Sequence, residues 1–449
     1  MLIAIWLLAC TTVAFASRNR PLVLVGLAFT IWTLVPAAAS PMLVGQLPGS
    51  LAYRAGSWFI ICCVSVLILA EPRELLDELA RRFPTYLCLA LVVLEAILVA
   101  RLSPDRGGVV IVVDQVLCPV LLFFVTGAAV GSGRGSITLI RNWIIVLAAV
   151  ESAISLTQFV AGSALFYQKY YATFAWFHAA TETRWMGTTD HPLALSLLLC
   201  AALPLLAGLG RLCVQIPLAV MLAAGVLATQ SRTGLVVCAF GIIYLVFASR
   251  LDVGLKYLTL VLMGVGAYFV ASFALAAGVQ HRIADDTGST LARSTALQFF
   301  LSNWKEYLVT GNGISSSFQV SKFAGLQTSL ESSVLMYGVG LGLIFALLYF
   351  GAQAAVVLRS MFGKAPRGAA MCGFVLLIVP QTYSALATES LAGPLLWLGL
   401  AVAASRQPNR SFGANPDASA AAPSVATRQV GIGAQERRHE APSAALTRS

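Results

Sequence analysis

Long apolar runs separated by short polar loops dominate this chain of 449 residues and restrict what it can fold into. A membrane-spanning helix needs about 20 mostly apolar residues, because the hydrocarbon core of a bilayer is ~30 Å thick. The runs therefore predict an all-α, polytopic transmembrane helix bundle of about 12–13 spans. They lie at 1–16, 21–38, 55–70, 84–101, 109–130, 137–161, 191–209, 213–229, 233–249, 255–278, 332–358, 368–385 and 391–405.

Composition agrees with a membrane protein and argues against several other classes. Only 11% of the residues are charged, against about 25% in a soluble domain. The net charge of +10 is expected to lie in cytoplasmic loops and near lipid headgroups, and not to bind nucleic acid. The nine cysteines fall almost entirely in apolar runs and form no CxxC pair, so neither a disulfide framework nor a metal site is expected.

Lysine and arginine in the short loops predict the orientation, because cytoplasmic loops carry an excess of both. Thirteen such residues fall in one set of alternating loops and four in the other. The richer set is expected in the cytoplasm, so the long polar segments 162–190 and 279–331 face the opposite side, which in a bacterium is the periplasm. The thirteen are Arg18, Arg20, Arg73, Arg81, Arg82, Arg134, Arg141, Arg211, Arg250, Lys256, Arg359, Lys364 and Arg367; the four are Arg54, Arg101, Arg106 and Arg232.

The chain divides into a membrane part, 1–405, and a tail, 406–449. The tail is rich in Ala, Pro, Ser, Gln and Arg without apolar periodicity, so we expect it to be disordered in the cytoplasm. The first run lacks the preceding positive charge of a signal peptide and is expected to be a retained span with its N-terminus outside. Residues 71–82 form an expected amphipathic surface helix that begins at Pro72.

The segment 162–190 is rich in aromatic residues and ends with a basic motif. Its aromatic side chains, Trp176 among them, are expected either to form an interfacial belt or to stack on sugar rings. Arg184 contradicts the charge rule for this side of the membrane and is expected to meet an anion or a carboxylate. His191 is a candidate general base, although a histidine at such a place more often only forms hydrogen bonds.

The turn Ser231-Arg232-Thr233-Gly234 offers hydroxyls, a guanidinium group and a glycine that allows close approach of a ligand. This combination suits phosphate oxygens. A snorkelling arginine that anchors the end of a helix is the alternative.

The segment 280–342 is the longest stretch between apolar runs that is neither apolar nor of low complexity. A helix is predicted from Ser289 or Thr290 to about Leu308, with Arg293 in its first turn and Trp304 on its apolar face. The turn Gly311-Asn312-Gly313 follows it. Glu331 opens the next apolar run, and an ionisable group at such a place is a candidate functional residue.

In this order the motifs resemble the O-antigen ligase and Wzy-type O-antigen and exopolysaccharide polymerase superfamily over about residues 130–405. The motifs are Arg184-x-x-Gly187 with His191-Pro192, Ser231-Arg232-x-Gly234, Arg293, Gly311-x-Gly313, Glu331-Ser332-Ser333 with Gly338, and Thr388-Glu389-Ser390. The resemblance implies a bacterial inner-membrane glycosyltransferase that acts at the periplasmic face without metal or nucleotide. It would transfer a glycan from undecaprenyl diphosphate to an acceptor sugar, alongside a flippase and a chain-length regulator of the same pathway.

The expected roles follow from that chemistry. Arg184, Arg232 and Arg293 would hold the diphosphate and stabilise its developing charge. Glu331 is the first choice for the base, with His191 and Asp190 behind it. Expected substrate contacts are completed by Trp176, Trp304 and Asn312.

One departure from the family pattern favours a polymerase over a ligase. Ligases of this superfamily usually carry a His-Asn pair before the last long loop ends, whereas residues 325–333 contain no histidine. A ligase that transfers the glycan to lipid A-core or another acceptor is the first alternative. A polysaccharide transporter or flippase is the second, although no internal repeat of the kind common in transporters is found.

Overall fold

A computed structural model describes residues 1–102, 107–174, 177, 184–249, 251–271, 287–326, 329–363 and 365–405. Contacts group Met1–Gln407 into one unit, to which everything below refers. All regular structure in the described residues is helical, as the apolar runs predicted, and no strand occurs among them. The predicted disordered tail, 406–449, lies outside the described residues.

Four helical stretches in the described part are long and apolar enough to cross a membrane. They are α6 (Phe83–Leu102), Gly108–Gly131, α9 (Ile137–Ala161) and α19 (Leu343–Phe362), where Gly108–Gly131 joins most of α7 (Gly107–Ile111), a π-helical turn (Val112–Leu117) and α8 (Cys118–Gly131). Two sharply bent pairs raise the number to six if each pair is one span. The structure thus supports a multi-pass membrane protein, while the predicted count of about 12–13 spans stays a prediction.

The bent pairs and the shorter apolar helices make up most of the remaining bundle. In the first pair, α2 (Pro21–Leu34) meets the helical stretch Ala37–Val44, which ends in α3 (Pro41–Val44), at 94°. In the second, α4 (Ala55–Ala70) meets α5 (Pro72–Arg81) at 104°. The α5 helix confirms the helix predicted at 71–82. The shorter helices are α1 (Leu2–Ala16), α11 (Pro192–Leu205), α12 (Leu212–Ala228), α13 (Arg232–Ala248), α20 (Ala369–Ile378) and α21 (Ala392–Ala404); α14 (Val253–Ala271) follows α13.

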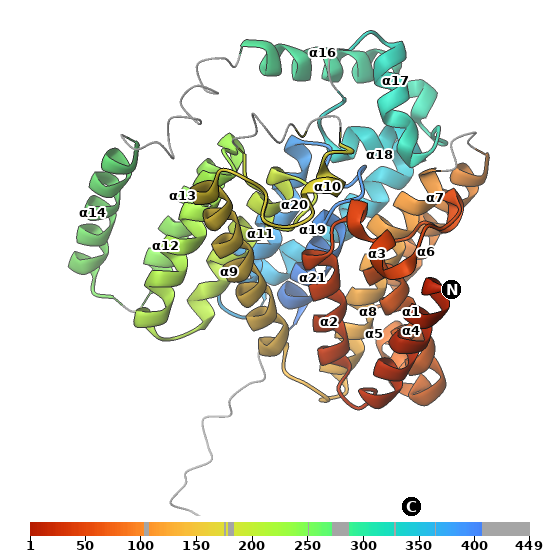
Figure 1. Cartoon of the computed structure of the whole chain (residues 1–449), viewed down its shortest axis with the longest axis horizontal. Helices are drawn as coiled ribbons and strands as arrows, with labels where there is room; N and C mark the ends of the chain where they lie inside the picture. Colours follow the sequence, from red (N-terminus) through yellow and green to blue (C-terminus); the bar gives the residue numbers. More distant parts are fainter. Residues whose placement is uncertain are drawn as a thin grey trace, which may run out of the picture. The chain divides into compact units, whose positions relative to one another are not determined.

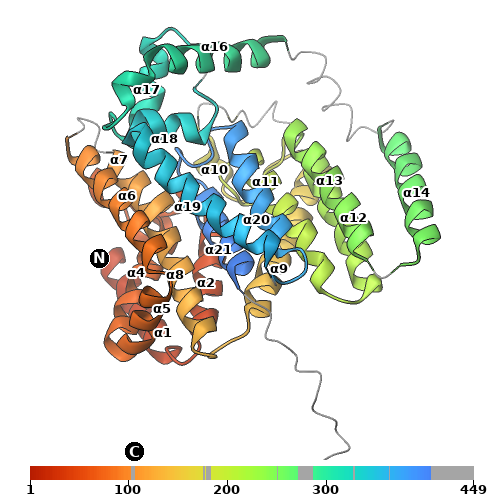
Figure 2. The same cartoon turned by 180° about the vertical axis from the view of Figure 1, so that it is seen from behind.

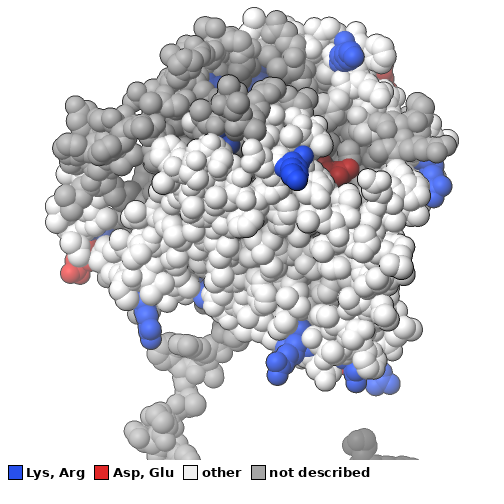
Figure 3. Space-filling model, viewed as in Figure 1, with Lys and Arg blue, Asp and Glu red and all other residues white. Residues whose placement is uncertain are grey.

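The loops gather at two ends of the bundle. At the end drawn lowest in Figure 1, Arg134 forms ion pairs with Glu71 (2.9 Å) and Glu74 (2.7 Å), and Arg141 donates to the carbonyl oxygen of Gly208 (2.9 Å). We call this the basic end, because its loops hold most of the thirteen basic residues assigned to the cytoplasm. Figure 3 shows several basic side chains along the lower margin of a face that is otherwise largely uncharged.

The opposite end, called the site end below, contains the segments 35–54, 184–191, 229–231, 304–326, 329–331 and 380–391. The helices α16 (Thr287–Asn303), α17 (Ser317–Phe323) and α18 (Ser333–Leu341) lie at this end in both views (Figures 1 and 2). The α16 helix and the 3-10 turn Trp304–Tyr307 together match the helix predicted from about 289 to 308.

The centre of the bundle is formed by helices that are apolar on every side. In α11 all but one residue is buried, and in α21 all but one. A helix without a polar stripe has to be surrounded by other helices or by lipid. Trp397 of α21 donates its indole N–H to the hydroxyl of Tyr349 at 2.9 Å, which satisfies the one polar atom that this side chain brings into the core.

The predicted single run 332–358 is divided into two helices. The first, α18, ends at Leu341, and α19 begins at Leu343 after Gly342, whose φ of +98° strongly favours glycine. The turn 311–313 pairs with the end of α18: Asn312 N–H donates to Val339 and Gly313 N–H donates to Gly340, both at 2.9 Å. Gly313 has the positive φ predicted for this turn (+100°).

Gly311 sits where two backbones touch, and replacing it by alanine is expected to destabilise the protein. A Cβ at this position would lie 2.2 Å from the carbonyl carbon of Gly340 and 2.5 Å from the nitrogen of Leu341. Because backbone atoms cannot rotate away, we expect Gly311→Ala to lower the free energy of unfolding by about 1–3 kcal/mol. Gly254→Ala is the control, since a Cβ there meets nothing within 4 Å. Chemical unfolding in detergent micelles measures both; equal stability of the two variants would contradict the close approach.

Candidate functional site

The segment 380–391, called the hub segment below, connects the elements of the site end. After α20 the chain forms a 3-10 turn (Val379–Thr382) and further turns before α21 begins at Ala392. Ser333 of α18 donates its hydroxyl to Pro380 O at 2.7 Å, and Tyr337 donates to Leu386 O at 3.1 Å. The hub segment is therefore fixed against the helix that follows Glu331.

Two further contacts join the hub segment to the rest of the bundle. The Tyr383 hydroxyl donates to Leu193 O at 3.4 Å, at the N-terminal end of α11. Gln115, in the π-helical turn, donates to Ser390 O at 2.7 Å and accepts from Gly393 N at 3.0 Å. A π-helical turn inside an α-helix is rare and occurs often at functional sites.

Arg293 and Glu331, which are 38 residues apart, form an ion pair at the site end. Arg293 Nε lies 2.8 Å from Glu331 Oε2, and Arg293 Nη2 donates to Thr382 O of the hub segment at 3.4 Å. The side chains are 48% and 23% exposed, so the pair contributes little to stability and an incoming anion can compete for the guanidinium. Glu331 has a φ of +46°, which is uncommon outside glycine and often marks functional sites.

Arg184 and Arg232 belong to segments that lie against each other. Trp185 N–H donates to Ala228 O at 3.1 Å, and Arg184 Nε donates to Thr229 O at 3.2 Å. Arg232 is the first residue of α13, where the Ser231 hydroxyl caps the helix by accepting from Gly234 N at 3.0 Å. A helix N-terminus carries partial positive charge, so the field there favours an anion.

Two polar side chains of α9 hold the segment 187–190 inside the bundle. The Gln158 amide accepts from Gly187 N at 2.9 Å and donates to Gly187 O at 2.8 Å. The Glu151 carboxylate accepts from Thr188 N at 2.8 Å and from the Thr188 hydroxyl. Gly187 has a φ of +63°, and a Cβ there would lie 2.1 Å from Glu151 Oε2, which explains the glycine of the Arg184-x-x-Gly187 motif.

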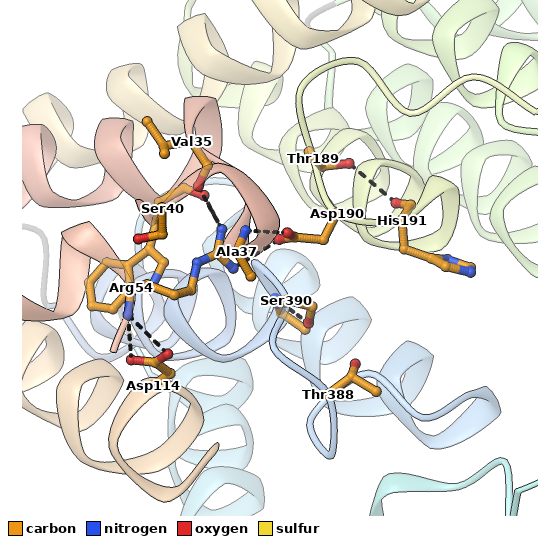
Figure 4. A network of polar contacts seen from close by, with 12 residues as sticks. Val35, Ala37, Ser40, Arg54, Asp114, Thr189, Asp190, His191, Thr388 and Ser390 are labelled. Atoms are coloured by element: carbon orange, nitrogen blue, oxygen red, sulfur yellow. Dashed lines mark hydrogen bonds and ion pairs between the residues drawn. The ribbon is translucent and has the colours of Figure 1, made fainter. Parts of the chain in front are cut away.

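A buried ion pair fixes Asp190, the last residue of the segment 187–190 (Figure 4). Arg54 Nη1 lies 2.9 Å from Asp190 Oδ2, and the two side chains are 2% and 5% exposed. Arg54 Nη2 donates to Trp32 O (3.1 Å) and Val35 O (2.9 Å), while Ala37 N–H donates to Asp190. Burial raises the pKa of Asp190, and Arg54 and the Ala37 N–H oppose that shift. These partners make Asp190 an anchor of the segment.

Arg54 was not among the residues selected from the sequence. The signal was present, because Arg54 is a basic residue in a loop assigned to the non-cytoplasmic side, which is the argument that selected Arg184. Its backbone N–H donates to both carboxylate oxygens of Asp114, at 3.4 Å and 3.2 Å. Arg54 therefore connects the segment 184–191 to the start of α4 and to the π-helical turn.

His191 is the N-cap residue of α11, and its ring already has a structural role. Nδ1 accepts from Leu193 N at 3.1 Å. In a neutral imidazole whose Nδ1 accepts, the proton is on Nε2. Taking up a proton at Nδ1 would break the cap, so the geometry favours His191 as a hydrogen-bond donor over the role of general base.

The remaining predicted substrate residues differ in their surroundings. Trp304 lies in the 3-10 turn after α16 and is 37% exposed, so its ring is accessible. Asn312 uses its backbone N–H in the pairing with α18 described above. Trp176 lies outside the described residues. Of the other aromatic residues in its loop, Tyr171 and Phe177 are buried against each other, with ring centroids 5.7 Å apart.

Glu389 is the acidic residue of the hub segment. It is exposed, and it makes no hydrogen bond or ion pair with any residue that the structure describes. Even so, burial among surrounding protein atoms raises its pKa; Arg54 opposes this shift and Asp190 adds to it. Figure 4 shows its neighbour Ser390 near the Arg54–Asp190 pair and Thr388 further away, with the His191 ring pointing away from Asp190.

Among the described residues, no group of three or more His, Cys, Asp or Glu side chains is arranged to hold a metal ion. No protein-family model matches the chain, and no curated protein matches its sequence. The resemblance to the ligase and polymerase superfamily therefore depends on the motifs alone.

Proposed function

We propose that this protein is a bacterial inner-membrane polysaccharide polymerase that joins repeat units carried on undecaprenyl diphosphate. The observation that carries the proposal is the position of Arg184, Arg232 and Arg293 in segments at one end of an apolar bundle. The hub segment connects Arg293 to the start of α11, through Thr382 and Tyr383. Separated arginines at a membrane-facing end suit a lipid-linked diphosphate, because guanidinium groups bind phosphate oxygens with paired hydrogen bonds.

An apolar recess on the helix that begins at Arg232 supports a substrate with a lipid tail. A cavity of about 220 Å³ lies between α13 and α20 and is lined only by apolar side chains. It begins about one and a half turns into α13, the helix that starts at Arg232, and it reaches Val379, at the entry to the hub segment. Along α13, the positive charge of Arg232 is thus followed by an apolar surface. This arrangement suits a substrate with an anionic head and a lipid tail.

In the proposed reaction, a hydroxyl of the acceptor repeat unit attacks the anomeric carbon of the donor glycan. The bond from that carbon to the diphosphate oxygen breaks, and undecaprenyl diphosphate leaves with the electron pair. The arginines stabilise the charge that grows on the leaving group, and a base takes the proton of the hydroxyl. The bound diphosphate would displace Glu331 from Arg293, since their pair is exposed and weak.

Arg232→Ala and Arg293→Ala test the proposal directly. Loss of one group that stabilises developing negative charge lowers kcat by roughly 10²–10³-fold, so we expect single repeat units to accumulate on the lipid carrier. Purified protein in detergent is given lipid-linked repeat units, and the glycans are separated by gel electrophoresis. Arg211→Ala is the matched control, since Arg211 is an exposed residue at the start of α12, at the basic end. Full-length polymer from both test variants would remove these arginines from the mechanism.

The same assay separates the alternatives. A ligase transfers a preformed glycan to a lipid A-core acceptor and makes no longer chains from repeat units alone. A transporter makes no polymer in detergent at all. Polymer formed by the purified wild type from lipid-linked repeat units is the outcome that the polymerase proposal requires.

A further inference from the structure

We propose that Glu389 is the catalytic base that takes the proton from the acceptor hydroxyl, an inference that rests on the proposed function. The resemblance contributes only the motif Thr388-Glu389-Ser390, and the sequence favoured Glu331 for this role. The contacts of the site end favour Glu389 for three reasons, which concern its position, its availability and its electrostatic surroundings.

The position of Glu389 is set by the hub segment, which contacts the helix of Arg293, the start of α11 beside His191, and the helix that follows Glu331. Thr382 accepts from Arg293, and Tyr383 donates to Leu193, two residues after His191. On the other side, Ser333 donates to Pro380 and also accepts from Leu386 N, three residues before Glu389. Glu389 is the acidic residue of this central segment, whereas Glu331 lies at its edge.

Availability distinguishes Glu389 from the other carboxylates nearby. Glu331 is paired with Arg293, and Asp190 is buried against Arg54 and Ala37. Asp114 is completely buried and accepts from the Arg54 backbone. The Glu389 carboxylate reaches solvent and forms no hydrogen bond or ion pair within the described part of the chain. A base has to contact the hydroxyl it deprotonates, and this carboxylate can do so without breaking an existing interaction.

The surroundings of Glu389 prepare it to accept a proton. The charged groups that act on it are Arg54 from the start of α4 and Asp190 from the segment before α11, and it interacts in turn with Asp114 of the π-helical turn. The other charged or titratable groups on the elements packed against the hub segment are Arg293 of α16, which donates to Thr382 O, and Tyr337 of α18, which donates to Leu386 O. Although its carboxylate reaches solvent, surrounding protein atoms displace part of its water; this desolvation is the largest cause of its raised pKa, and Asp190 adds to it. A raised pKa makes a carboxylate a stronger base as long as the pH is high enough to keep it ionised.

The step balances without a further reactant. The hydroxyl proton moves to a Glu389 carboxylate oxygen as the hydroxyl oxygen forms its bond to the anomeric carbon. The bond from that carbon to the diphosphate breaks with its electron pair on the departing diphosphate. The protonated Glu389 then releases its proton to water, which its exposure permits.

The test compares Glu389→Gln, Glu389→Asp and Glu331→Gln in polymerisation by the purified, full-length protein. Loss of a general base slows the chemical step by roughly 10²–10⁴-fold, so we expect a kcat decrease of this size in Glu389→Gln with little change in KM for the lipid-linked donor. Glu389→Asp should recover part of the rate, because it restores a carboxylate. Glu331→Gln is expected to retain a rate within about tenfold of the wild type, with any effect mainly on KM.

The pH profile gives a readout that a purely structural role would not change. The wild-type rate should rise as the pH increases through the raised pKa of Glu389, since the base acts only when ionised. This rise should be absent in Glu389→Gln and shifted in Glu389→Asp, while thermal unfolding temperatures stay equal.

The outcomes separate the two proposals. A wild type that makes polymer, together with a Glu389→Gln variant within tenfold of its rate, would overturn the assignment of the base and leave the polymerase intact. A large loss in Glu331→Gln with none in Glu389→Gln would return the role to Glu331. A wild type that makes no polymer from lipid-linked repeat units would overturn both proposals.

Discussion

Replacing Arg54 by methionine is expected to lower the free energy of unfolding by about 3–5 kcal/mol, because it removes one partner of a buried ion pair. Asp190 would be left at 5% exposure without its guanidinium partner. The carbonyl oxygens of Trp32 and Val35 would lose the donor that Arg54 Nη2 supplies. Chemical unfolding in mixed micelles measures the loss.

Three further variants make this test specific. Arg101→Met is the matched control, since Arg101 is exposed near the end of α6, and its stability should be unchanged. Arg54→Lys keeps the charge but not the guanidinium fork, so an intermediate loss is expected. Adding Asp190→Asn to Arg54→Met removes the uncompensated charge while keeping an acceptor for Ala37 N–H, so the double variant should be more stable than Arg54→Met alone. An Arg54→Met variant as stable as Arg101→Met would contradict the buried pair.

The parts of the fold that could be predicted are those with local sequence signals. Pro72 at the first helical position predicts the start of α5, and the Ser231 hydroxyl caps α13 from one residue before Arg232. The apolar periodicity after residue 289 locates α16. In each case the residues that decide the structure lie within one or two helical turns of each other.

The hub segment could not be predicted in this way, because its contacts join distant residues. Gln115 and Gly393 are 278 positions apart, and Ser333 and Pro380 are 47 apart. The break at Gly342 likewise depends on the approach of Val309, whose carbonyl oxygen would lie 2.3 Å from a Cβ at that glycine. A hydropathy profile does not detect the break at such a glycine, so the sequence predicted one continuous apolar run over 332–358.

Some of the missed residues did leave a signal in the sequence. Asp114, Glu151 and Gln158 are polar residues inside apolar runs, where polar side chains are costly and usually have a function. The structure shows that Glu151 and Gln158 hold the backbone of the segment 187–190. The sequence could have indicated that these residues need partners, but only the fold identifies those partners.

Replacing Gln158 by leucine is expected to release the segment that carries Arg184, Asp190 and His191. The leucine has a similar length but no amide, so the N–H and carbonyl oxygen of Gly187 would both lose their partner. Each buried backbone group left without a hydrogen bond costs about 1–3 kcal/mol. Because the segment can open locally, we expect the free energy of unfolding of the whole protein to fall by less than the sum of these two costs. Under the proposed function, polymerisation should fall strongly, since Arg184 is three residues from Gly187.

Hydrogen exchange of the amides in 184–191 measures this release, and Thr157→Val is the control. Thr157 is the neighbouring residue of α9, is exposed, and donates only to Ala153 O of its own helix. Faster exchange in Gln158→Leu but not in Thr157→Val is the expected result. Equal exchange in both variants would show that the Gln158 amide does not hold the segment.

A double-mutant cycle joins this prediction to the one for Arg54. Gln158 and Arg54 hold opposite ends of the same four residues, 187–190. Once Arg54→Met has released one end, the Gln158 amide has less ordered structure to stabilise. In a protein that carries Arg54→Met, Gln158→Leu should therefore lower the free energy of unfolding by less than it does in the wild type. An interaction energy of at least about 0.5 kcal/mol is expected for residues coupled through a shared segment. Additive losses would mean that the two anchors hold separate structures.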